Sequence, residues 1–151
     1  MTLYGVVLAV HVTAVLAAYG APIIYPLLVP YVRRRHPSAL SAVHDAQYWL
    51  NTRVAPVASV GIVGAGVYMG FDRNLWSEAW LIAGLSLFAV ISVVGLVVIV
   101  PSTRRLADLA RSDSTAAGPQ YQATYRRYMA VEVALGVLVV AAVFVMAAKP
   151  H

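Results

Sequence analysis

The sequence contains no cysteine and very little charge. Without a thiol, the chain cannot form disulfides, carry out thiol redox chemistry or hold a metal through Cys ligands. Charged residues make up only 11% of the chain, whereas soluble domains carry about 25%. Hydrophobic residues account for 61%, so too few polar side chains remain to cover a surface that faces water. The sequence therefore predicts that lipid surrounds most of the chain.

Long apolar runs replace the missing charge. About 20 apolar residues cross a bilayer as a helix, and we expect such spans at about 3–32, 54–71, 79–100 and 129–148, the third ending at Pro101. Apolar residues spaced by three or four predict an amphipathic cytoplasmic helix over 39–53, and the polar residues 103–127 predict a cytoplasmic loop. The predicted fold is all-α, an antiparallel four-helix transmembrane bundle in a single domain, 1–151.

The basic residues predict the orientation of the bundle. Nine arginines fall in the first and third connections, and only Arg73 and Lys149 fall on the other side. Because cytoplasmic loops are enriched in Lys and Arg, this asymmetry places both termini outside the cytoplasm. The net charge of +5 is then explained by contact with lipid headgroups, so nucleic acid is not an expected partner.

His11 is the first candidate functional residue, because an ionisable side chain inside a membrane is costly. It shares a helical stripe with Ala14 and Ala18, which indicates that it faces the other helices. A neutral imidazole there could bind haem or a metal, or relay protons; the alternative is a structural histidine bonded to a neighbour. Met69 and Met146 lie toward the same side and are either second axial ligands or packing residues.

Glu132, in the fourth span, is the second candidate. It is expected to form a partly buried ion pair with Arg53 or Arg127 that fixes the register of the bundle. The alternative is a proton or cation site.

Other polar and aromatic residues fall in the predicted cytoplasmic segments. His36 and His44 are expected to be solvated rather than metal ligands. An aromatic belt at the inner interface is expected from Tyr48, Trp49, Tyr121, Tyr125 and Tyr128.

Several short motifs resemble those of a bacterial family of predicted integral membrane proteins, domain of unknown function 2269. The motifs are Leu8-Ala9-Val10-His11, Trp76 and Trp80 before the third span, Tyr125-Arg126-Arg127, and the closing Val145-Met146-Ala147-Ala148-Lys149-Pro150. The resemblance covers nearly the whole chain and implies a multi-pass protein of the bacterial cytoplasmic (inner) membrane with no assigned activity. The chain is distantly similar to copper-resistance D-type proteins and to the haem-binding membrane protoporphyrinogen oxidase, which implies a ligand role for His11 alone.

Three functions are compatible with these features. The sequence shows no nucleophile triad, phosphate loop or nucleotide fingerprint. Few polar groups converge at one depth and the small-residue faces suit helix partners, which favours a non-enzymatic accessory or haem-binding component of a membrane assembly. The sequence does not identify the cofactor, for which haem b is one candidate. Such a component would contact lipid and either other membrane subunits or a second copy of itself. The alternatives are a haem- or quinone-dependent membrane oxidoreductase that uses His11, and a small proton-coupled transporter that uses Glu132.

Overall fold

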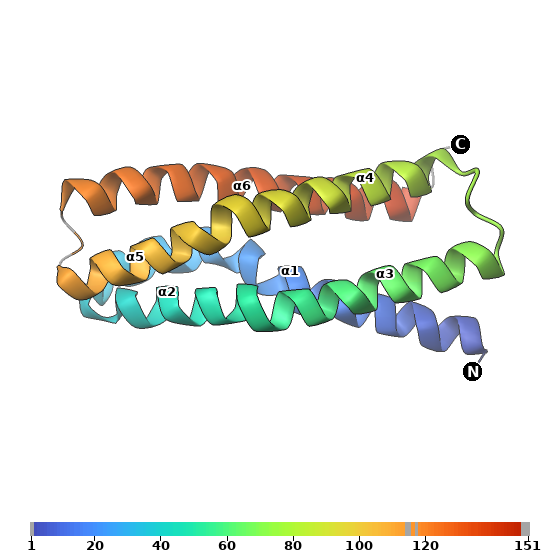
Figure 1. The fold of residues 1–151 in the computed structure, drawn as a ribbon, viewed down its shortest axis with the longest axis horizontal. Helices are drawn as coiled ribbons and strands as arrows, with labels where there is room; N and C mark the ends of the chain where they lie inside the picture. The colour runs from blue at the N-terminus through green and yellow to red at the C-terminus, as the bar shows by residue number, and fades with distance from the viewer. Residues whose placement is uncertain (1, 114–115, 117, 149–151) are drawn as a thin grey trace.

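The computed structural model describes residues 2–113, 116 and 118–148, and within them the chain runs back and forth as four long helices (Figure 1). The first is α1, Leu3–Arg35. The second consists of η1 (Pro37–Ala39), α2 (Leu40–Trp49), η2 (Leu50–Val54) and α3 (Ala55–Asp72); the third of α4 (Ala79–Val94), η3 (Gly95–Ile99) and α5 (Val100–Ser112); and the fourth is α6, Pro119–Ala148. The predicted all-α four-helix fold is confirmed. Lys149 and His151 lie outside the described residues.

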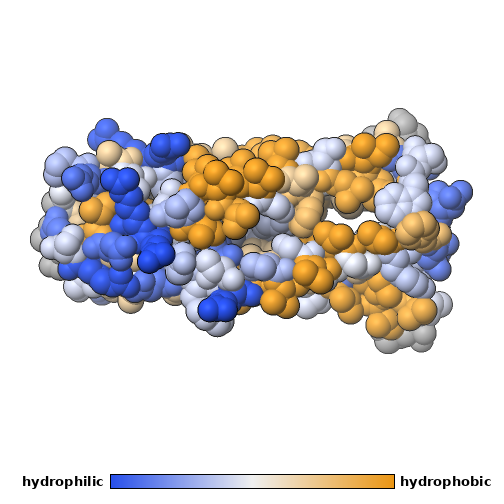
Figure 2. Space-filling model, viewed as in Figure 1, coloured by the Kyte–Doolittle hydropathy of each residue, from blue (hydrophilic) through white to orange (hydrophobic). Residues whose placement is uncertain are grey.

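The two ends of the bundle differ in polarity. One end contains the last turn of α1, with Arg33, Arg34 and Arg35, together with α2, α5 and the start of α6, and we call it the Arg-rich end. The other, which we call the terminal end, contains the start of α1, the end of α6 and the α3–α4 connection (Figure 1). Apolar side chains cover the middle of the molecule, whereas hydrophilic ones gather at the Arg-rich end (Figure 2).

Large apolar side chains point outward along the whole middle of the bundle. Leu27 is 77% exposed and Val57 is 74% exposed, values that would be unfavourable in water but suit contact with lipid. Each of the four long helices has at least 30 residues and is apolar enough to cross a membrane, so each is longer than the roughly 20 residues that a bilayer requires.

Prolines change the shape of two helices without ending them. Pro56 and Pro101 are each the second residue after a π-helical turn, Leu50–Val54 and Gly95–Ile99 respectively. A proline lacks an N–H and its ring clashes with the carbonyl four residues earlier. The turn before it widens, and the N–H of Ala55 bonds to the carbonyl of Leu50, five residues back.

The helices consequently continue beyond the predicted spans. The third helix does not end at Pro101, because the widened turn accommodates the proline and α5 runs on to Ser112. Within 103–127, expected as a loop, residues 103–112 are instead the remainder of α5 and residues 119–127 are the first turns of α6, which begins at Pro119. Their polarity reflects position outside the apolar band of the bundle rather than a lack of helix.

Small residues bring the helices together in two pairs at the terminal end. The α1–α3 pair is close where a Cβ on Gly61 would lie 3.3 Å from that of Ala14. The α4–α6 pair is close where the Met146 side chain occupies the space that a Cβ on Gly84 would need. Figure 2 shows an opening between the two pairs at this end. The Arg-rich end holds the larger of the two buried apolar clusters, around Val29, Leu40 and Leu106.

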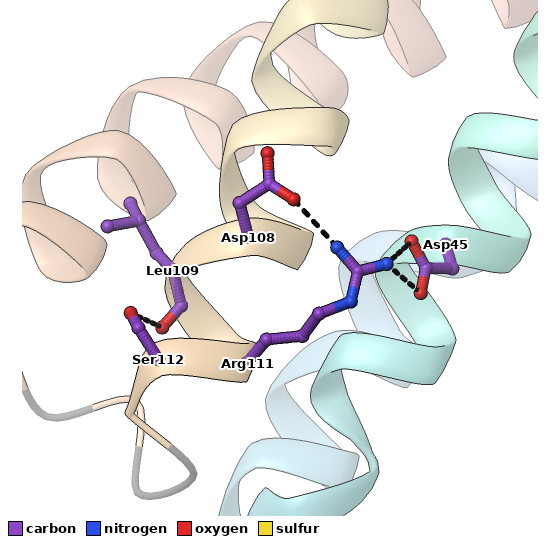
Figure 3. A network of polar contacts seen from close by, with 5 residues as sticks. All are labelled: Asp45, Asp108, Leu109, Arg111 and Ser112. Carbon is purple, nitrogen blue, oxygen red and sulfur yellow. Dashed lines mark hydrogen bonds and ion pairs between the residues drawn. The ribbon is translucent and has the colours of Figure 1, made fainter.

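An ion-pair network joins the second and third helices at the Arg-rich end. The guanidinium of Arg111, near the end of α5, lies between the carboxylates of Asp45 on α2 and Asp108 one turn earlier on α5 (Figure 3). The Arg111 side chain is 51% exposed. Pairs as exposed as this contribute about 0–1 kcal/mol, so the network orients α2 and α5 more than it stabilises them.

Candidate functional site

A cavity of about 710 Å³ lies between the four long helices. Its wall is mostly apolar and includes Pro22 and Ile23 from α1, Val60 from α3 and Phe88 from α4. Gly64 and Gly136 also line it, and a Cβ added to either would meet no atom within 4 Å. The volume is in the range of pockets that bind small molecules, about 300–1,000 Å³.

Buried polar atoms without a hydrogen-bond partner gather at this cavity. Glu132 Oε1 and Asn51 Nδ2 are both buried, both without a partner, and both on lining residues. The hydroxyl of Tyr25 is also buried without a partner, although Tyr25 itself is not a lining residue. An unmade hydrogen bond on a buried group costs about 1–3 kcal/mol. Native structures contain few such groups, so their concentration at one cavity indicates a site that another molecule completes.

The two π turns position the polar wall. Asn51 lies in the π turn of the second helix, whereas Gly95, Leu96 and Ile99 come from the π turn of the third helix, and all four line the cavity. A π turn inserts extra backbone into a helix and rotates the residues beyond it, a feature frequent at functional sites. Pro56 and Pro101 are therefore the sequence features that shape this cavity.

Glu132 is more buried than expected and is not joined to the predicted arginines. It is 2% exposed and lies one turn beyond Tyr128 on α6. Arg53 is exposed and lines a different groove, together with Trp49. Arg127 is exposed as well. The structure thus leaves Glu132 without a cationic partner among the described residues.

His44 is fully buried, contrary to the expectation that it is solvated. Its Nδ1 lies 2.7 Å from Gln47 Oε1, and its Nε2 lies 3.0 Å from the Tyr121 hydroxyl. An amide oxygen only accepts, so Nδ1 carries the proton and Nε2 accepts from Tyr121. Gln47 Nε2 then donates to the Tyr128 hydroxyl at 3.0 Å. These four residues form a continuous chain, the His44 network, that leads from the Arg-rich end to Glu132.

The His44 network also corrects the predicted aromatic belt. Tyr121 is 2% exposed and Tyr128 is fully buried, so both belong to the core, whereas Trp49 is exposed as expected of an interface residue. Burial lowers the pKa of His44, and the hydrogen bond that His44 donates to Gln47 and the nearby Asp45 only partly oppose this effect. The imidazole is therefore a neutral, structural group. The shared stripe of Leu40, His44 and Gln47, at spacings of four and three, is the sequence signal for its burial.

His11 lies outside the cavity wall, between α1 and α3. Its Nδ1 is 3.0 Å from the backbone oxygen of Ile62, and its ring covers Gly66. Because a carbonyl only accepts, Nδ1 carries the proton, and in the neutral ring Nε2 keeps its lone pair. This is the arrangement of many metal-binding histidines.

The structure separates the two methionines that were considered as axial partners of His11. Met69 lies one turn beyond Gly66 on α3, in the same helix pair as His11. Met146 packs against Gly84, in the α4–α6 pair. Among the residues that the structure describes, no three of His, Asp and Glu are grouped to hold a metal ion.

Four helices of membrane-crossing length and large exposed apolar side chains along the middle of the bundle define a polytopic integral membrane protein. A family model described as predicted integral membrane protein, domain of unknown function 2269, matches residues 5–150. The chain belongs to this family. No curated protein and no solved structure matches it significantly.

Proposed function

We propose that this chain is a non-enzymatic membrane component that binds a small lipophilic molecule in the central cavity. The observation that carries the proposal is the coincidence of Glu132 Oε1 and Asn51 Nδ2, both buried and unpartnered, in one apolar cavity of about 710 Å³. An apolar wall with a few converging polar groups is the usual composition of a small-molecule site. The wall supplies affinity for the body of the ligand, and the polar groups fix its orientation.

The setting of this site follows from the distribution of arginine. Nine arginines fall in the two connections at the Arg-rich end, which supports a cytoplasmic location for that end and an external location for both termini in a bacterial inner membrane. The opening between the two helix pairs at the terminal end (Figure 2) supports contact with another membrane subunit or with a second copy.

Filling the cavity tests the binding function. The neutral fluorescent probe N-phenyl-1-naphthylamine is titrated into the full chain in detergent. Gly136 lines the cavity, and a Cβ added there meets no atom within 4 Å, so the larger side chain of Gly136→Leu should weaken probe binding at least tenfold. Gly20→Leu is the matched control, because a Cβ added there also meets no atom within 4 Å but Gly20 does not line the cavity. Equal binding by both variants would refute the cavity as the site.

Haem binding at His11 is a second candidate, supported by the bond from Nδ1 to Ile62, which leaves Nε2 as a potential ligand atom. Protein extracted from cells supplied with haem precursors should then show a Soret band that His11→Ala removes and His36→Ala, at an exposed position, retains. A band unchanged in His11→Ala would exclude this ligand. Reduction of the bound haem by a quinol would extend the proposal to an oxidoreductase.

A further inference from the structure

We infer that the ligand of the cavity is a lipophilic monocation, and that it competes with a proton for the Glu132 carboxylate. The inference rests on the proposed function, because it concerns the same cavity. It specifies the charge of the ligand and the linkage of its binding to pH.

The first argument is the absence of a counter-charge. Glu132 is the one acidic or basic side chain among the described residues of the cavity wall. The polar groups around it are all uncharged: Tyr25 from α1, Asn51 from the second helix, Ser92 from α4 and Tyr128 on α6 itself. A carboxylate taken out of water needs an opposite charge nearby. Without one from the chain, Glu132 must hold either a proton or a cation from outside.

The second argument is the burial of the carboxyl. Glu132 is 2% exposed and belongs to the cavity wall, and its Oε1 is buried without a hydrogen-bond partner. The Tyr128 hydroxyl, one turn earlier on α6, already accepts a hydrogen bond from Gln47. A buried acceptor without a partner is destabilising, so a cationic group that reaches this carboxyl from the cavity would supply the missing interaction.

The third argument is the aromatic content of the wall. The rings of Tyr19 and Phe88 line the same cavity, and the faces of aromatic rings attract cations. A lipophilic cation therefore gains contact with apolar surface, with ring faces and with the carboxylate in one site. A neutral lipophile gains only the contact with apolar surface. An anion would be repelled by Glu132 once the carboxyl ionises.

Competition with the proton follows from these arguments. The cation binds when Glu132 is ionised, and a protonated Glu132 must release its proton as the cation enters. Nothing is oxidised or reduced, because the proton passes to solvent and the cation takes its place. Exchange of this kind is the binding step that a proton-coupled transporter requires.

Tetraphenylphosphonium is a suitable probe for the full chain in detergent. Its apparent affinity should rise about tenfold per pH unit wherever Glu132 is mostly protonated, since only the ionised fraction binds. Calorimetry in two buffers of different ionisation enthalpy should show proton release in the same range. Glu132→Gln should lose at least tenfold in tetraphenylphosphonium affinity but keep its affinity for N-phenyl-1-naphthylamine. Glu78→Gln is the matched control, because Glu78 precedes α4 and does not line the cavity.

The outcomes separate this inference from the proposed function. Unchanged tetraphenylphosphonium binding in Glu132→Gln, or affinity independent of pH, would overturn the inference. The proposed function would still stand if Gly136→Leu lost the neutral probe. Failure of wild-type protein to bind either probe would overturn both.

Discussion

Two clusters of buried polar side chains follow one another along the same helices, and they differ in whether their hydrogen bonds are made. The His44 network, which consists of His44, Gln47, Tyr121 and Tyr128, is closed by three hydrogen bonds of 2.7–3.0 Å. The cavity cluster begins one turn further along, with Asn51 on the second helix and Glu132 on α6. Both residues line the cavity, and each has one buried polar atom without a hydrogen-bond partner.

The difference separates a structural role from a binding role. The network satisfies its polar groups with one another and lies in the larger buried apolar cluster, at the Arg-rich end, so its free energy stabilises the fold. The cavity cluster also consists of polar side chains with buried atoms, but those atoms lack hydrogen-bond partners within the described chain. Its groups therefore lower the stability of the empty protein, and binding of a ligand would compensate for that loss.

We expect the largest change in stability when the imidazole is removed from the His44 network. His44→Ala leaves buried polar atoms on Gln47 and Tyr121 without partners and opens a small void, so we expect the free energy of unfolding to fall by about 3 kcal/mol. Unfolding in mixed micelles measures this value. His36→Ala, at an exposed position, should change it by less than about 0.5 kcal/mol. Equal values for the two variants would contradict a stabilising role for the network.

Acidification should also lower the stability of the folded protein through His44, but by a smaller amount. Burial lowers the pKa of His44 below its ordinary value of 6.5, so the unfolded chain binds the proton more readily than the folded one. The stabilising contribution is therefore complete above pH 6.5 and decreases as the pH falls from there through the folded pKa. The melting temperature at pH 5 should lie below that at pH 7. This difference should shrink in His44→Gln, and an equal difference in both proteins would assign it to other groups.

In the cavity cluster, by contrast, we expect removal of a polar side chain to raise the stability of the protein. Glu132→Leu replaces a buried carboxyl that lacks a cationic partner with an apolar group of similar size, so the ligand-free protein should gain about 1 kcal/mol. Glu78→Leu, away from the cavity, should bring no such gain. A clear loss of stability in Glu132→Leu would mean that the carboxyl has a structural partner, and the contrast between the two clusters would disappear.

The sequence was sufficient to predict the architecture, but not to distinguish the hydrogen-bonded His44 network from the unpartnered cavity cluster. Hydropathy located the four helices, and the small residues around His11 correctly placed it against another helix, where it meets Ile62 and Gly66. Hydropathy treats His44 and Glu132 alike, as polar residues that should seek water or a charge. Whether they are satisfied depends on partners from distant turns: Tyr121 lies 77 residues from His44 in the chain. Local periodicity carries no information on such pairs.

The π turns were missed for a related reason. A proline in an apolar run is compatible with a helix end, a kink or a widened turn, and the local sequence around Pro101 does not distinguish among them. The outcome depends on whether the following residues can continue as a packed helix. The buried Leu106 and Ala110 of α5 join the core of the Arg-rich end, and this tertiary contact favours continuation over termination.

The smallest effect is expected outside both clusters, at the ion pairs of Figure 3. Arg111→Ala removes the contacts to Asp45 and Asp108, but all three side chains are about half exposed, with values of 47–62%. Water and salt screen such pairs, so we expect a loss of about 0.5 kcal/mol that decreases further in 0.5 M NaCl. The same unfolding measurement in low and high salt tests this value. A loss as large as that of His44→Ala would show that charge, rather than the buried network, holds the Arg-rich end together.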